Sequence, residues 1–179
     1  MCDSIKVRIW LPAQEGFIGD VARKAGVGHA SITLVSNKTK YYITWMANGT
    51  PLRPWELDPF MKFHKFGLQE DKGNMVDFFG TAKSQYKFNL VTKPPDSDAD
   101  GVDAQKIEAF WLERLKNPPK YSFLSTRNNC TGCVADALRA GGLDNWVNMP
   151  QATFVQDAGD LLAWLLEAEQ KGLANKARG

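Results

Sequence analysis

Hydrophobic and polar residues alternate in short stretches of the first half of the chain, as they do in strands that bury one face. The stretches cover residues 5–11, 29–35, 41–46 and 85–92. A polar segment over residues 36–40 has the length of a hairpin loop and separates the second stretch from the third. We therefore expect an antiparallel strand pair across this loop.

The second half has helical periodicity instead. Apolar residues recur at helical spacing over residues 103–116, 129–140 and 156–171, and prolines or glycines follow the first two segments. Residues 51–85 are broken by prolines and glycines, and no long element is predicted there. Strands first and helices last favour an α+β class in one domain, 1–179, with a frayed polar tail over 173–179.

Composition narrows the class of protein further. The 179 residues are 44% hydrophobic, enough for a sizeable core, and the net charge of +2 is too small to indicate nucleic-acid binding. No apolar run approaches the ~20 residues of a membrane helix, and the start of the chain lacks the apolar segment of a signal peptide. We expect a protein made in the cytoplasm, with export, if any, by a route that needs no cleaved signal.

Two residues carry the predicted chemistry. Cys130 begins the second helical segment, and a helix N-terminus favours a thiolate. A thiolate nucleophile needs a base within hydrogen-bond reach. His29 opens a strand directly after the small residues Gly26-Val27-Gly28, which leave room for a helix end to approach. The sequence therefore predicts that Cys130 and His29 form a nucleophile–base pair.

Other interpretations of the same residues stay open. Cys130 could be an inert buried thiol, because free cysteine is among the most buried residue types, and His29 could be structural. Cys133 is expected in the core. A zinc site would need two more ligands beside the Cys130–Cys133 pair, from His29, His64 or Cys2, and no second close pair exists. No metal or cofactor is expected, and His64 is interpreted as a packed or surface histidine.

Three motifs together resemble a known superfamily. They are the segment from Gly28 to Leu34, the following strand from Tyr41 to Trp45, and the run Asn129-Cys130-x-x-Cys133-Val134. They resemble the circularly permuted branch of the NlpC/P60 papain-like superfamily, in which the histidine strand precedes the cysteine helix. The branch includes lecithin–retinol acyltransferase-like enzymes, whose motif has Phe where this chain has Cys133. The resemblance implies an antiparallel sheet packed on a cysteine-bearing helix.

The resemblance also implies roles for the two residues. Cys130 would be the nucleophile, and its backbone N–H would contribute to an oxyanion hole. His29 would be the general base and later the general acid.

The third polar residue of such a site usually lies on the strand after the histidine. If the loop has four residues, 37–40, then His29 pairs with Asn48; if it has five, His29 pairs with Ala47. An asparagine orients an imidazole through its carbonyl oxygen, and Thr44 is another candidate. We assign Asn48 as the third catalytic residue, an assignment that one residue of register would change.

The functional expectation is a cysteine hydrolase that cleaves an amide or peptide bond through a thioester, as a bacterial cell-wall peptide amidase or a secreted effector. Acyltransferase, lipid deacylase or glutamine deamidase activity could use the same Cys–His pair. A non-catalytic papain-like binding module is the alternative from another class. Expected partners are a peptide or acylated substrate and a cognate inhibitor protein, with export by a contact-dependent secretion system.

Overall fold

The computed structural model describes residues 3–11, 28–44, 84–94, 97–117, 119, 129–149 and 157–177. The strands are β1 (Ser4–Trp10), β2 (His29–Ser36), β3 (Thr39–Ile43), β4 (Tyr86–Leu90) and β5 (Ala174–Lys176). The helices are α3 (Ala104–Lys116), α4 (Cys130–Ala140) and α5 (Ala158–Gln170), with a short 3₁₀ helix, η1 (Leu143–Asn145).

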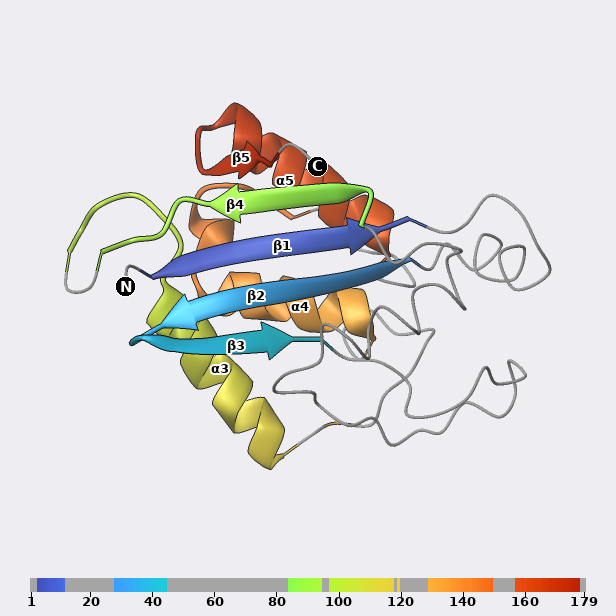
Figure 1. Ribbon diagram of the computed structural model, residues 1–179. Coiled ribbons are helices and arrows are strands. Elements are labelled where there is room, and N and C mark those ends of the chain that lie inside the picture. Colours follow the sequence, from blue (N-terminus) through green and yellow to red (C-terminus); the bar gives the residue numbers. More distant parts are fainter. Residues whose placement is uncertain are drawn as a thin grey trace, which may run out of the picture.

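The five strands form one antiparallel sheet in the order β3-β2-β1-β4-β5. The three described α-helices lie on one face of this sheet, with α4 behind β1 and β2 (Figure 1). The expected α+β fold, with an antiparallel sheet packed on the cysteine-bearing helix, is therefore confirmed.

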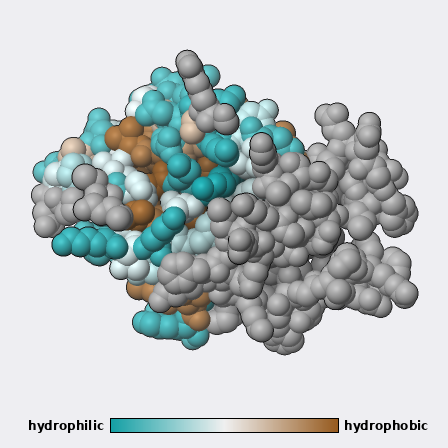
Figure 2. Space-filling view, in the orientation of Figure 1, coloured by the Kyte–Doolittle hydropathy of each residue, from teal (hydrophilic) through white to brown (hydrophobic). Residues whose placement is uncertain are grey.

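Alternation decides which residues enter the core. In β1, Ile5, Val7 and Ile9 are buried, whereas Lys6 and Arg8 between them are partly exposed. The buried set packs with apolar residues of the helices into one cluster. The opposite face, toward the viewer in Figure 2, shows hydrophilic residues with smaller hydrophobic areas among the described residues.

Each of the three described α-helices begins at a side chain that caps it. Asp103, Asn129 and Asp157 precede the helices α3, α4 and α5, and each accepts a hydrogen bond from a backbone N–H of the first turn. These N–H groups have no partner inside the helix, so an acceptor at the cap stabilises the helix start. The caps explain why the helical segments begin within two residues of their predicted starts.

The connection between β2 and β3 differs from the predicted loop. Ser36 pairs with Thr39, so the turn holds only two residues, Asn37 and Lys38. Their φ angles are 50° and 65°, the left-handed conformation that tight hairpin turns require. The four- and five-residue loops were wrong, because a turn without glycine carries little sequence signal.

The C-terminal segment is also ordered where fraying was predicted. Ala174–Lys176 forms β5, which pairs with β4 and places Ala174 opposite Leu90. Leu173 and Ala174 are buried. The expectation of a frayed tail from residue 173 is corrected for these residues, because backbone hydrogen bonds to a sheet edge do not depend on apolar composition. None of the described helices is long and apolar enough to cross a membrane.

Candidate active site at the start of the cysteine helix

Cys130 is the first residue of α4 and points to the start of β2. The side chain of Asn129 caps the helix by accepting the Gly132 N–H at 2.6 Å. The Cys130 Sγ lies 3.5 Å from the Gly28 carbonyl oxygen and 3.8 Å from the Thr131 hydroxyl. The thiol is thus held against the residue directly before His29.

His29 is the first residue of β2, and its imidazole has two described neighbours. Its Nε2 lies 3.1 Å from the Thr44 hydroxyl. The Trp10 ring lies 5.3 Å from the imidazole, centroid to centroid, with a tilt of 47° between their planes. Trp10 is also the register partner of His29 across β1 and β2. The imidazole is buried, with 2% of His29 exposed.

The structure brings the predicted pair to the same end of β2 without joining them. Alternation places His29 on the sheet face that carries Ser31, whereas Ala30 faces the helices. The thiol approaches from the helix side, because Cys130 is the first residue of α4. Between Cys130 and His29, both in the described part of the chain, there is no side-chain hydrogen bond.

Burial keeps both groups neutral in this arrangement. Burial raises the pKa of the Cys130 thiol, and hydrogen bonds from Thr131 and nearby backbone N–H groups only partly offset it. Burial lowers the pKa of His29 to about 3. The expectation that the helix N-terminus would favour a thiolate therefore does not hold here, because removing a charge from water outweighs the helix-end effect.

Gly28 explains how three elements meet at this point. A Cβ atom on Gly28 would lie 2.2 Å from the Trp10 carbonyl oxygen and 2.5 Å from the Ala158 Cβ. The end of β1 and the first residue of α5 therefore leave no room for a side chain. The sequence predicted that the small residues before His29 make space for a helix end, and α5 occupies that space.

The remaining predicted residues divide into two groups. Asn48, His64 and Cys2 lie outside the described residues, so the role assigned to Asn48 stays a prediction. Thr44, the other candidate for the third residue, is the one found on the imidazole. Trp10 was missed, because only the register of β1 against β2 reveals that it faces His29.

Cys133 lies one turn after Cys130 and is fully buried in the core, as expected. Burial raises the pKa of its thiol to about 12, so it is not a nucleophile at neutral pH. Within the described ranges, no three His, Cys, Asp or Glu residues gather in a way that could hold a metal ion.

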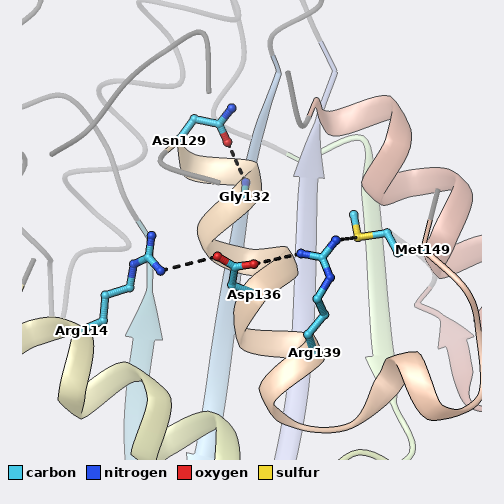
Figure 3. Close-up of polar contacts among 6 residues, drawn as sticks. All are labelled: Arg114, Asn129, Gly132, Asp136, Arg139 and Met149. Atoms are coloured by element: carbon cyan, nitrogen blue, oxygen red, sulfur yellow. Dashed lines mark hydrogen bonds and ion pairs between the residues drawn. The ribbon is translucent and has the colours of Figure 1, made fainter. Parts of the chain in front are cut away.

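Asp136 anchors the outer face of α4. Its carboxylate accepts from Arg139 at 2.9 Å and pairs with Arg114 of α3 at 3.6 Å (Figure 3). A second nitrogen of Arg139 lies 3.0 Å from the Met149 sulfur. These contacts hold α4 between α3 and the chain that follows it, and so hold Cys130 against β2.

Comparison with known proteins adds a family to this geometry. Residues 52–178, more than half of the chain, match the family described as the IcsB middle domain. The chain belongs to the IcsB middle domain family. The matched region contains Cys130 but begins after His29.

One solved structure supports the fold. The crystal structure of the type VI secretion system effector TseH covers 98% of this chain, and the chain covers 98% of TseH, with a TM-score of 0.55 and 13% identity. At this identity the likeness shows the fold alone. No curated protein matches this IcsB middle domain.

Proposed function

We propose that this chain is a secreted bacterial effector that acts as a cysteine hydrolase on an amide bond. Cys130 is the nucleophile, His29 is the base, and the fold is the permuted papain-like one. The observation that carries the proposal is the Cys130 Sγ at the first residue of a capped helix, 3.5 Å from the carbonyl of Gly28, which precedes His29. The fold shared with the effector TseH supports secretion.

In the proposed reaction, His29 takes the thiol proton as Cys130 attacks the carbonyl carbon. The amine leaves with the proton from the imidazolium, and water hydrolyses the thioester. Because both groups are neutral when buried, the proton moves during the attack and no ion pair forms beforehand. Thr44 holds Nε2, so Nδ1 is the base in this proposal, and the imidazole must move within reach of Sγ.

A non-catalytic binding module is the second candidate. It is favoured by one observation: the thiol and the imidazole lie on different sides of β2, both buried and both neutral. Such a module would keep the fold and bind a peptide without cleaving it.

An activated ester separates the two candidates. The wild-type protein is incubated with p-nitrophenyl acetate, and the acetyl adduct is mapped by mass spectrometry. We expect acetylation at Cys130, slowed about 100-fold or more in His29→Ala and unchanged in His64→Ala. Equal rates in the two histidine variants would remove His29 from its role, and no acetylation of Cys130 would favour the binding module.

The substrate class needs a second experiment. Wild type and Cys130→Ala are incubated with purified peptidoglycan, and the released products are read by mass spectrometry. Peptide release by the wild type alone supports a cell-wall amidase. Parallel incubations use phospholipid and a glutamine-bearing protein. Products from one of these in place of peptidoglycan would assign the substrate to that class.

A further inference from the structure

The sheet and the helices differ in charge. The described strands contain the basic residues Lys6, Arg8, Lys40, Lys87 and Lys176, and they contain no aspartate or glutamate. The whole chain is nearly balanced, with 22 lysine and arginine residues against 20 aspartate and glutamate residues. Each of the described α-helices includes at least one acidic residue. Positive charge is therefore concentrated in the sheet, although the net charge is only +2.

Three of these cations lie together on the sheet face away from the helices. Arg8 is the register partner of Lys87 across β1 and β4, so the two side chains stand side by side on the same face. Lys6 lies two residues before Arg8 and shares this face, because the intervening Val7 is buried in the core on the other face. Neighbouring positions of this kind have Cβ atoms ~5–8 Å apart. The hydrophilic face toward the viewer in Figure 2 therefore carries a Lys6–Arg8–Lys87 cluster.

The three charges are not neutralised within the described part of the chain. Lys6, Arg8 and Lys87 are all partly exposed, and none of them forms an ion pair with a described carboxylate. On the helices, by contrast, Lys116 pairs with Glu113 and Lys171 pairs with Glu167. The cluster thus lacks the counter-charges that lysines elsewhere in the protein have.

The Arg8 side chain has a fixed direction. Its guanidinium donates to the Thr33 hydroxyl at 2.6 Å, and Thr33 is the register partner of Lys6. This neutral partner leaves the charge of Arg8 in place and turns the guanidinium toward Lys6. Like charges directly opposite each other in a sheet are destabilising, so folding alone does not account for the cluster.

We propose that the Lys6–Arg8–Lys87 cluster is a docking surface for the acidic surface of another protein. Aspartate and glutamate carboxylates would supply the counter-charges that the cluster lacks, and a guanidinium binds a carboxylate through two parallel N–H donors. This inference does not depend on the reaction of Cys130.

Two observations favour a protein over an extended anionic surface such as a membrane. The exposed large hydrophobic residues of the described ranges are Leu112 in α3 and Trp146 after η1, so neither lies in the sheet, where it could insert among lipids beside the cluster. The net charge of +2 also gives only weak attraction to a large anionic surface. A small group of cations on one face matches a local group of carboxylates instead.

The test uses a hexaglutamate peptide as the acidic probe. The full chain, labelled with ¹⁵N, is titrated with this peptide at low salt and followed by NMR. We expect amide shifts centred on β1 and β4 around the cluster, and weaker binding at about 150 mM salt. The combined variant Lys6→Gln, Arg8→Gln, Lys87→Gln should bind at least about 5-fold more weakly. No shifts in the wild type, or shifts centred on the helices, would overturn the inference.

The matched control removes the same number of charges from the helix side. The combined variant Lys106→Gln, Lys116→Gln, Lys171→Gln should bind hexaglutamate within about 2-fold of the wild type. Equal weakening in the two combined variants would show that net charge alone drives binding, and the inference would be wrong.

Two further measurements complete the test. Lys87→Gln alone keeps the bond between Arg8 and Thr33, and it should weaken binding about 2-fold in a folded protein. Wild-type affinity in this variant would count against the cluster. Sedimentation with phosphatidylglycerol vesicles is the last measurement. If the wild type sediments with the vesicles but does not bind hexaglutamate, the cluster binds a membrane and the proposed protein partner is wrong.

Discussion

The two ends of β2 differ in how their polar side chains are paired and in whether they carry a charge. At the Ser36 end, the Glu108 carboxylate of α3 accepts hydrogen bonds from Ser36 at 2.7 Å, from Asn37 at 3.0 Å and from Tyr41. At the His29 end, the thiol and the imidazole are neutral and the Trp10 N–H has no described partner.

The difference between Glu108 and His29 shows which polar groups stay charged in this fold. Burial raises the pKa of Glu108, but the hydrogen bonds from Tyr41, Ser36 and Asn37 outweigh it and hold the pKa below its ordinary value. His29 lies deeper, and burial lowers the pKa of its imidazole to about 3. Three hydrogen bonds to Glu108 join α3 to the hairpin at the Ser36 end, whereas burial keeps the imidazole at the His29 end neutral.

The largest expected effect concerns the nucleophile. Cys130→Ala should lower acetylation by p-nitrophenyl acetate at least about 1,000-fold, because no other described thiol is poised to react. Cys133→Ala is the control: its thiol is buried with a pKa of about 12, so acetylation should persist. Loss of acetylation in both variants, with both folded by circular dichroism, would contradict the separate roles of the two cysteines.

Acid should lower the free energy of unfolding through His29. The folded pKa of His29, about 3, lies below the ordinary 6.5, so between these values the unfolded chain binds a proton that the folded one does not. Stability is therefore full above about pH 6.5 and falls as the pH drops, by up to about 1.4 kcal/mol per pH unit. Urea unfolding between about pH 7 and pH 5 measures this slope, and His29→Phe should flatten it. An equal slope in both proteins would show that the imidazole is not buried.

A substitution at the Ser36 end should change the stability of the protein but not the reactivity of Cys130. Glu108→Ala removes the acceptor of three hydrogen bonds and should lower the free energy of unfolding by about 1–2 kcal/mol, discounted because the residue is only partly buried. Acetylation of Cys130 should not change. Glu113→Ala on the same helix, an exposed residue paired with Lys116, should cost less than about 0.5 kcal/mol. A drop in acetylation for Glu108→Ala would mean that the two ends are coupled.

The smallest expected effect comes from comparing the caps of α4 and α3. Asn129→Ala and Asp103→Ala should each lower the free energy of unfolding by about 1 kcal/mol, because each cap accepts a backbone N–H. Only Asn129→Ala should also alter the alkylation rate of Cys130, since Asn129 begins the helix that carries the thiol. Identical alkylation rates in the two variants would show that the cap does not position the thiol.

Local patterns were sufficient for much of this protein. The periodicity and caps of α3 and α4 follow from near neighbours in the chain, so their bounds were predicted within a residue. The alternation of β1 and β2 and the α+β class were predicted for the same reason. The placement of Cys130 at a helix start, after a histidine that opens a strand, was likewise evident from the sequence.

Only the tertiary structure decided the rest. The two-residue turn at Asn37 and Lys38 sets the register of β2 and β3, and with it the contact of Thr44 with His29. β5 depends on the free edge of β4, which no local pattern reports. The neutral state of Cys130 and the position of Trp10 depend on residues far away in sequence. Burial and register are properties of packed elements, so the pattern of a single segment does not contain them.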